Sequence, residues 1–258
     1  MKNEQSLLCF GARRHCYDFS SSGYVNLMPP GHTAGGDSKE AVAARRSFLG
    51  KEYYRPAADA LADTLVKYLE DGATVIDAGC GEGYYTSAIA KRGFSVAGGD
   101  ISKPAAECAA KRASGEGIDH GFFAVGSVYS LPFLDGSADA VVNVFAPCAE
   151  DEFSRVLKSG GILAVMYAGQ EHLWGLKSAI YDSVRENEER ADMPKCMRLV
   201  EEIRVRFDIM VEGQESLQKL FAMTPYYWRT SKGDAEKLKL LSFIETPVDM
   251  VIAIYKKD

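Results

Sequence analysis

The sequence predicts an α/β protein with a Rossmann-like, mostly parallel seven-stranded sheet that is flanked by helices and preceded by a small irregular N-terminal module. From residue 74 onward, short apolar runs alternate with helical patterns, which is the order of parallel βαβ units. The first run, TVIDAG, ends in glycine, as is typical of a buried parallel strand before a turn. The stretch GCGEG follows at 79–83 and precedes a helical segment, which predicts a glycine loop after the first strand.

The individual elements follow from periodicity and from the residues that interrupt it. After Pro56, Leu61, Leu65 and Leu69 recur at helical spacing, and Gly72 ends that pattern. The expected strands are 74–79, 94–100, 120–126, 137–145, 160–167, 197–210 and 248–255. The expected helices are 38–49, 58–71, 84–92, 104–113, 171–190, 214–222 and 233–242. We therefore divide the chain into an N-terminal module at 1–37 and a main domain at 38–258, with 170–245 as an inserted cap.

Bulk composition fits a globular protein in an aqueous compartment, with 47% hydrophobic and 26% charged residues among 258. No apolar run approaches the roughly 20 residues of a membrane helix, and the N-terminus lacks the apolar segment of a secretory signal. We therefore expect a cytoplasmic protein without a membrane partner. The six cysteines are scattered without a C-x-x-C pair, so we expect thiols rather than a disulfide framework.

The charge of the chain is unevenly distributed. The net charge of −6 is not typical of a protein that coats nucleic acid. Residues 1–55 nevertheless hold eight Lys and Arg against five Asp and Glu. A basic arm on an acidic body is compatible with a polyanionic substrate, and equally with ordinary surface charge.

Acidic residues around the glycine loop indicate the class of ligand. Asp77 precedes Gly79 by two residues and Glu82 lies inside the loop, where carboxylates would repel a pyrophosphate but suit a cationic amino acid group. Asp100 closes the second strand, 21 residues after Gly79, where an acid accepts hydrogen bonds from ribose hydroxyls. S-adenosylmethionine carries both groups, so we expect it as cofactor and S-adenosylhomocysteine as product. A nicotinamide-binding Rossmann domain is the alternative.

The segment GSVYSLPF after the third strand strengthens that expectation, because a Leu-Pro loop there commonly borders adenine in methyltransferases. The arrangement resembles the class I S-adenosylmethionine-dependent fold. The residues expected to contact the cofactor in these loops are Asp77, Gly79, Gly81, Glu82, Gly83, Tyr85, Asp100, Ser127, Val128, Leu131 and Phe145. Cys80, inside the glycine loop, is interpreted as a small residue that fits rather than as a nucleophile.

Further segments resemble one family, the bacterial 23S ribosomal RNA guanine-N1 methyltransferases. In family order they are GYVNLM, ARRSFL, YYRPAADAL, VIDAGCGEGYYT, DISKPA, AAKR, LPFLDGSADAV, FAPC, HLWGLKSAIY and MTPYYWR. The resemblance implies methyl transfer from S-adenosylmethionine to N1 of a guanine in 23S ribosomal RNA, and a homodimer. It also implies that Tyr54 and His172 contact the cofactor beside Gly81 and Glu82, and that the cap lies on the substrate side.

The acceptor base is expected at the loop VFAPC after the fourth strand, where Phe145 and Pro147 would position it. N1 of guanine must lose its proton during transfer, and the sequence does not identify the group that accepts it. Aromatic stacking and phosphate contacts are expected from the exposed arm and the MTPYYWR segment. The candidate RNA-binding residues are Arg13, Arg14, Arg45, Arg46, Trp228 and Arg229. Core packing is the alternative for the aromatic residues of that segment.

Two rival functions stay open on the sequence. The first is a small-molecule methyltransferase of the same fold, with the cap roofing a hydrophobic acceptor pocket. The second is a protein that binds S-adenosylmethionine without catalysis. Transfer of label to ribosomal RNA would separate them from the RNA enzyme.

Cys9, His15 and Cys16 lie where the resemblance implies a zinc finger with an opening C-x-x-C pair and a later Cys-x-x-x-His pair. A structural zinc ion needs four ligands. The opening pair is absent here, so at most three ligands remain. We therefore expect no bound metal, and we interpret residues 1–37 as the remnant of an RNA-recognition module.

Overall fold

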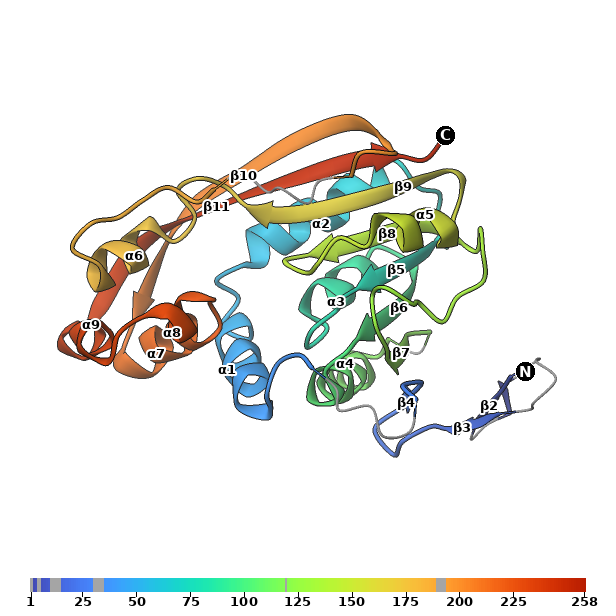
Figure 1. Cartoon of the computed structure of the whole chain (residues 1–258), viewed down its shortest axis with the longest axis horizontal. Coiled ribbons are helices and arrows are strands. Elements are labelled where there is room, and N and C mark those ends of the chain that lie inside the picture. Colours follow the sequence, from blue (N-terminus) through green and yellow to red (C-terminus); the bar gives the residue numbers. More distant parts are fainter. Residues whose placement is uncertain (1, 4–5, 10–14, 30–34, 119, 189–193) are drawn as a thin grey trace.

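The computed structural model describes residues 2–3, 6–9, 15–29, 35–118, 120–188 and 194–258. Within these residues the central sheet has eight strands, in the order β10-β11-β9-β8-β5-β6-β7-β4 (Figure 1). Their bounds are β4 Tyr24–Asn26, β5 Thr74–Ala78, β6 Ser95–Asp100, β7 Phe122–Val125, β8 Ala138–Val144, β9 Leu157–Ala168, β10 Arg198–Glu212 and β11 Phe243–Lys256. Strand β11 is antiparallel to β10 and β9, and the other pairs are parallel. The predicted mostly parallel sheet is confirmed.

The described part of the sheet holds one strand more than the seven predicted, because β4 from the N-terminal region pairs in parallel with β7. Tyr24 and Val25 of β4 are buried, and a three-residue strand is too short for periodicity to reveal. The described residues before β4 form a separate antiparallel sheet in the order β1-β2-β3. Its strands are β1 Lys2–Asn3, β2 Ser6–Leu8 and β3 Cys16–Asp18. The domain division at residue 37 stays a prediction.

Helices cover both faces of the sheet, as short apolar runs in a parallel sheet require. On β9, Ile162 and Met166 pack in the cluster that contains Leu61 of α2, whereas Leu163 packs with Phe153 of α5 on the other face. The helices are α1 Lys39–Leu49, α2 Arg55–Val66, α3 Tyr84–Ala90, α4 Lys103–Gly115, α5 Glu150–Val156, α6 Trp174–Ile180, α7 Gln214–Ala222, α8 Tyr226–Arg229 and α9 Lys232–Lys237. A short 3₁₀ helix at Leu238–Leu240 follows α9.

The long helix expected at 171–190 is wrong. Helix α6 ends at Ile180, and the backbone of Tyr181 is extended. Asn187 explains the break, because its side chain donates to the carbonyls of Gly169 at 2.7 Å and His172 at 3.3 Å. The chain after α6 therefore folds back toward the start of the same helix. Hydrophobic periodicity does not predict such side-chain to backbone bonds.

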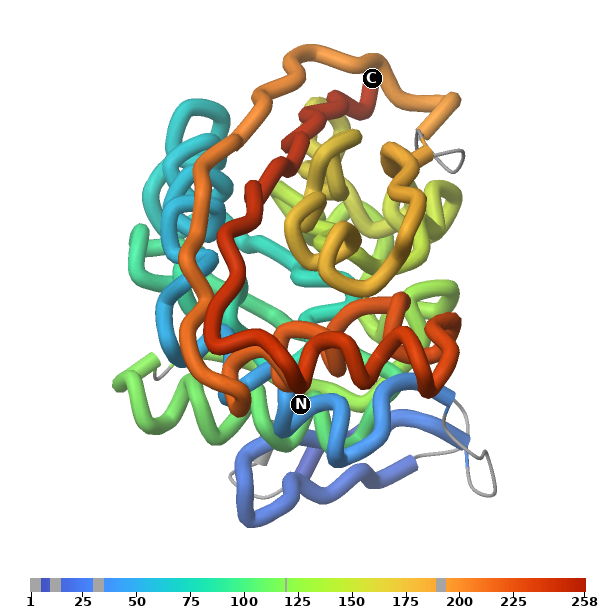
Figure 2. The backbone as a smooth tube through the Cα atoms, turned by 90° about the vertical axis from the view of Figure 1, so that its left-hand side faces the viewer, coloured from blue at the N-terminus to red at the C-terminus, as the bar shows by residue number. Residues whose placement is uncertain are grey.

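Helices α6 to α9 gather at the far end of β10 and β11, and α1 contacts both α7 and α4 (Figure 1). In Figure 2 the orange and red tubes of β10 and β11 run side by side toward those helices, and the blue N-terminal strands lie at the bottom of the view. Within the described ranges, no helix combines the length and apolar character needed to cross a membrane.

Candidate active site

Three loops meet at Gly79, the first residue of the glycine loop after β5. A Cβ atom added to Gly79 would lie 2.5 Å from Cβ of Ala146 and 4.0 Å from Cγ1 of Val128. Ala146 follows β8 and Val128 follows β7, so the loops after three parallel strands converge there. The φ angle of Gly79 is +87°, and this conformation alone would favour glycine at the position, apart from the lack of space. This edge of the sheet is where open α/β proteins bind their ligands.

Asp100, at the end of β6, holds the glycine loop from the side. Its Oδ2 accepts the backbone N–H of Gly81 at 2.9 Å, and its Oδ1 accepts the N–H of Ser102 at 2.7 Å. Burial raises the pKa of this carboxyl group, while both backbone hydrogen bonds lower it. The structure therefore places Asp100 beside the loop, as the sequence predicts.

Asp77 lies beneath the loop, with only 2% of its surface exposed. The hydroxyl of Thr86 donates to its Oδ2 at 2.5 Å. No described group bonds to the buried Oδ1 of Asp77, nor to the buried hydroxyl of Tyr85. Burial raises the pKa of Asp77 to about 7. Burying a carboxylate oxygen without a hydrogen-bond partner costs free energy, and a cationic ligand that donates to this oxygen would remove that cost.

Glu82, the acidic residue inside the glycine loop, is also buried, and among the described residues its Oε1 has no hydrogen-bond partner. Its carboxylate pairs with Arg112 of α4, with distances of 3.0 Å to Nε and 2.5 Å to Nη2. Burial raises the pKa of Glu82, and the Arg112 charge opposes that shift. The side chain thus ties the loop to α4, and direct contact between Glu82 and a cofactor stays a prediction.

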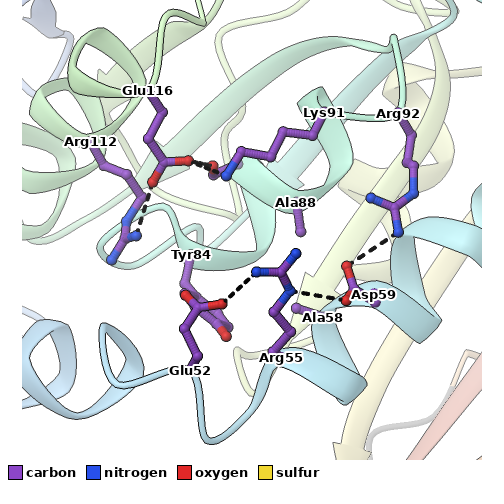
Figure 3. A pocket seen from close by; sticks show the side chains of 11 residues that line it. Glu52, Arg55, Ala58, Asp59, Tyr84, Ala88, Lys91, Arg92, Arg112 and Glu116 are labelled. Atoms are coloured by element: carbon purple, nitrogen blue, oxygen red, sulfur yellow. Dashed lines mark hydrogen bonds and ion pairs between the residues drawn. The ribbon is translucent and has the colours of Figure 1, made fainter.

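Arg112 also borders a small polar pocket on the outer side of α3, which Figure 3 shows from close by. The pocket has a volume of about 80 Å³, far below the roughly 300 Å³ at which drug-sized ligand sites begin. Ion pairs occupy it, among them Arg55 with Glu52 and Lys91 with Glu116. Its lining residues come from α2, α3 and α4 and the turns beside them, and its volume is too small for a nucleotide.

A second cluster joins Tyr54, His172 and Phe145, which come from three distant parts of the chain. The Tyr54 hydroxyl lies 3.5 Å from Nε2 of His172, and the Phe145 ring lies 5.8 Å from the His172 ring. Tyr54 and His172 are buried, whereas 49% of Phe145 is exposed. The φ angle of Phe145 is +51°, which is uncommon for a bulky residue and marks strain that its surroundings maintain.

His172 is held in one tautomer. The backbone N–H of Asp249 donates to its Nδ1 at 3.2 Å, so the proton of the neutral ring resides on Nε2. Burial lowers the pKa of His172 to about 4, although the Asp249 charge opposes the shift. The ring is therefore a neutral hydrogen-bond donor toward Tyr54 at physiological pH.

Asn143 on β8 is a residue that the sequence reasoning missed. Its Nδ2 donates to the carbonyl of Ala78 at 3.2 Å and to that of Pro147 at 3.1 Å. These bonds connect the end of β5 to the loop that carries Phe145. An asparagine within the apolar run DAVVNVF was the available signal, because a buried amide needs partners.

The remaining predicted residues divide between the site and the surface. Leu131 is buried among the loops, Ser127 accepts the N–H of Tyr129 at 3.2 Å, and Pro147 is exposed. Trp228 and Arg229 on α8 are exposed, with 77% of the surface of Trp228 accessible. Arg13 and Arg14 lie outside the described residues.

The two arginines expected on α1 point to different partners. Arg46 donates to Sγ of Cys108 at 3.2 Å, and Arg45 forms a short ion pair with Asp37. Arg45 also lies beside the glycine loop, because its Nη1 is 3.8 Å from a Cβ atom built on Gly81. Neither contact tests the predicted RNA binding.

The N-terminal Cys and His residues do not form a metal site among the described residues. The backbone N–H of Cys9 donates to the His15 carbonyl at 2.9 Å, whereas the Cys16 thiol faces Asp18 at 3.8 Å. Within the described ranges, no group of three or more His, Cys, Asp or Glu side chains is arranged so that it could hold a metal ion. The absence of zinc stays a prediction.

These groups fit S-adenosylmethionine. The unpartnered Oδ1 of Asp77 suits an ammonium group, and Asp100 at the rim suits ribose hydroxyls. Of the three glycines in the loop, Gly81 leaves space for a ligand to approach the backbone closely, because a Cβ atom there would meet no atom nearer than 3.8 Å. His172 lies on the loop between β9 and α6 and contacts Tyr54, and contact of either residue with the cofactor stays a prediction.

Comparison with known proteins identifies the same methyltransferase fold. Residues 76–165 match a family described as methyltransferase domain. The chain is 33% identical over 235 residues to the 23S rRNA (guanine(748)-N(1))-methyltransferase of Streptomyces fradiae, covering 83% of this chain and 78% of that protein. It is 30% identical over 277 residues to a Bacillus subtilis protein provisionally named a 23S rRNA (guanine-N(1)-)-methyltransferase, covering 98% and 92%.

A solved structure supports the fold alone. A protein of Galdieria sulphuraria, provisionally named a sarcosine dimethylglycine methyltransferase, has a TM-score of 0.51 and 15% identity to this chain. The match covers 81% of this chain and 88% of that one.

Proposed function

The chain belongs to the family of 23S rRNA (guanine-N1)-methyltransferases, and we therefore propose that it transfers a methyl group from S-adenosylmethionine to N1 of a guanine in 23S ribosomal RNA. The structural observation that carries the proposal is the position of Phe145. Its half-exposed ring stands on the loop that meets the glycine loop at Gly79, and it is held there in a strained left-handed conformation. An exposed aromatic ring beside a cofactor site can stack on a base that has left its helix.

Alignment is the main task of the protein in this reaction. Bound S-adenosylmethionine supplies a methyl group that its sulfonium has already activated. Asp77 would accept hydrogen bonds from its ammonium group, Asp100 would bind the ribose hydroxyls, and the loop with Val128 and Leu131 would border the adenine. Tyr54 and His172 would cover the cofactor, and Phe145 with Pro147 would position the guanine opposite the methyl group.

The proton on N1 of guanine must leave during transfer. His172 is unsuited to accept it, because Nδ1 already accepts a backbone N–H and the pKa of the ring is about 4. Asn143 is unsuited to donate toward O6, because its amide group bonds to two backbone carbonyls. Neither His172 nor Asn143 therefore serves the removal of this proton.

The RNA is expected to contact the face that carries Trp228 and Arg229. Both residues are exposed on α8, which belongs to the cap at 170–245. Stacking on an exposed tryptophan and a phosphate contact from an arginine are the usual modes of RNA binding. We place the reaction in the cytoplasm, on 23S RNA or a ribosomal precursor, and we expect a homodimer from the family resemblance.

Transfer of label tests this function. The purified protein is incubated with methyl-labelled S-adenosylmethionine and ribosomes that lack guanine-N1 methylation, and primer extension then locates the modified base. We expect label in 23S RNA and a new stop at a guanine. Label in a small molecule from a cell extract, with none in RNA, would favour the small-molecule alternative, and binding without transfer would favour the non-catalytic one.

A further inference from the structure

Arg45 occupies a place that the RNA-binding prediction does not explain. It projects from α1 toward the glycine loop, and its Nη1 is the nearest atom to a Cβ built on Gly81, at 3.8 Å. Helix α1 is firmly placed, because Val42 and Phe48 on either side of Arg45 are buried. The side chain of Arg45 itself is 29% exposed. The guanidinium of Arg45 is thus held next to the glycine loop and does not extend freely into solvent.

The surroundings of Arg45 are acidic. Asp37 pairs with it, and Asp100 and Glu82 are close enough that the Arg45 charge lowers the pKa of both. Arg112 is already paired with Glu82 and Glu116, and Arg46, whose charge also lowers the pKa of Glu82, donates to Sγ of Cys108. S-adenosylmethionine carries a carboxylate as well as an ammonium group, and in this acidic setting that carboxylate requires a cation.

We propose that Arg45 binds the carboxylate of the methionine part of S-adenosylmethionine, with Asp37 holding its guanidinium in place. The inference rests on the proposed use of S-adenosylmethionine, not on the identity of the acceptor. Among the described residues, Asp37 engages Nη1 of Arg45, and neither Nε nor Nη2 forms a hydrogen bond. An arginine has five N–H donors, so it can serve Asp37 and a second carboxylate together.

Asp37 is itself anchored to the cofactor side of the sheet. Its backbone carbonyl accepts the hydroxyl of Ser102 at 2.8 Å, and Ser102 follows Asp100 at the end of β6. A Cβ atom on the neighbouring Gly36 would lie 2.8 Å from Cγ2 of Ile101. The segment before α1 therefore packs against the rim that binds the ribose, which makes Arg45 part of the cofactor site.

The test compares two ligands that differ in the carboxylate alone. Dissociation constants for S-adenosylmethionine and decarboxylated S-adenosylmethionine are measured by calorimetry with the wild type, Arg45→Gln and Arg45→Lys. We expect Arg45→Gln to weaken S-adenosylmethionine about 10- to 100-fold, as loss of a charge-assisted hydrogen bond does, and to leave the decarboxylated ligand within about twofold. Arg45→Lys should recover part of the affinity.

Arg46→Gln is the matched control, because it removes the same charge from the next position, whose guanidinium faces Cys108. We expect it to leave the affinity for both ligands within about twofold. Equal weakening of both ligands by Arg45→Gln, or no weakening of either, would overturn the proposal, and so would weaker RNA binding with unchanged cofactor affinity. A methyl transfer assay that fails on RNA while the ligand discrimination holds would count against the proposed acceptor and not against Arg45.

Discussion

The backbone N–H of Asp249 donates to Nδ1 of His172 across 3.2 Å, and this bond fixes the proton of the ring on Nε2, 3.5 Å from the Tyr54 hydroxyl. Asp249 is fully buried on β11, and both its carboxylate oxygens bind Arg204 at 2.8 and 2.9 Å. The last strand of the sheet thereby sets the orientation of a histidine beside the cofactor site. His172 acts as a rigid neutral donor, not as a proton acceptor.

Replacing His172 should change how stability depends on pH. Its pKa is about 4 in the folded protein and about 6.5 when unfolded, so the unfolded state binds the extra proton between these values. The His172 contribution is thus lost as the pH falls from 7 to 5, by about 2 kcal/mol. His172→Asn, which keeps an acceptor near the position of Nδ1, should lose less stability than the wild type over that range in urea unfolding. Parallel pH profiles of the two proteins would contradict a buried neutral ring.

Asp77 should make cofactor affinity depend on pH. Burial raises its pKa to about 7, and an ammonium group favours the ionised carboxylate. Affinity for S-adenosylhomocysteine should therefore fall as the pH drops below 7, by up to about tenfold per unit. In calorimetric titrations at pH 8, Asp77→Asn should bind S-adenosylhomocysteine about 10- to 100-fold more weakly than the wild type. Its affinity should not show the acid limb, the fall in affinity below pH 7. The same acid limb in both proteins would show that another group titrates.

Gly79 should tolerate no side chain, because a Cβ atom would clash with Ala146. This clash can be distinguished from the strain of a positive φ angle. Gly79→Ala places a Cβ atom 2.5 Å from that of Ala146, whereas Gly93, at φ +91°, has open space around its Cβ position. Gly93→Ala should cost about 1–2 kcal/mol of folding free energy and leave cofactor affinity unchanged. Gly79→Ala should also weaken cofactor binding, by about 5- to 150-fold, because the loops after β5 and β8 must separate. Equal losses in both variants would mean that strain alone decides.

Trp228 should matter for RNA and not for the cofactor. Its ring is 77% exposed, and stacking of a base on such a ring is worth about 1–3 kcal/mol. Trp228→Ala should therefore weaken 23S RNA binding about 5- to 150-fold in filter binding, with unchanged affinity for S-adenosylhomocysteine. Leu240, 86% exposed in the same cap, offers the control, since Leu240→Ala removes exposed apolar surface without a ring. Unchanged RNA affinity in Trp228→Ala would place the RNA on another face.

The glycine loop and the strands on either side of it were predictable because their signals are local. The run TVIDAG with the glycines after it predicts the strand, the turn and the helix, and the structure has β5, the loop and α3 there. Asp100 was predictable in the same way from its spacing. The family resemblance was predictable from segments such as GYVNLM, and the comparisons confirm it.

Contacts between residues far apart in the chain could not be predicted from the sequence. The residues around Asn143 in the sequence do not indicate that it bonds to Ala78 and Pro147. The sequence around Arg45 likewise does not indicate that its side chain faces the glycine loop. The end of α6 depends on Asn187 bonding back to the carbonyl of Gly169, which periodicity cannot detect. These features arise when segments far apart in the chain meet at the carboxyl edge of the sheet.

The chemical identity of the methylated nucleoside tests the proposed reaction most directly. Ribosomes without guanine-N1 methylation are treated with the protein and S-adenosylmethionine, and the 23S RNA is digested to nucleosides for mass spectrometry. We expect 1-methylguanosine from the wild type and at least about tenfold less from Phe145→Ala at equal cofactor occupancy. Methylation of another base or another guanine atom, or no methylated nucleoside at all, would contradict the proposed reaction.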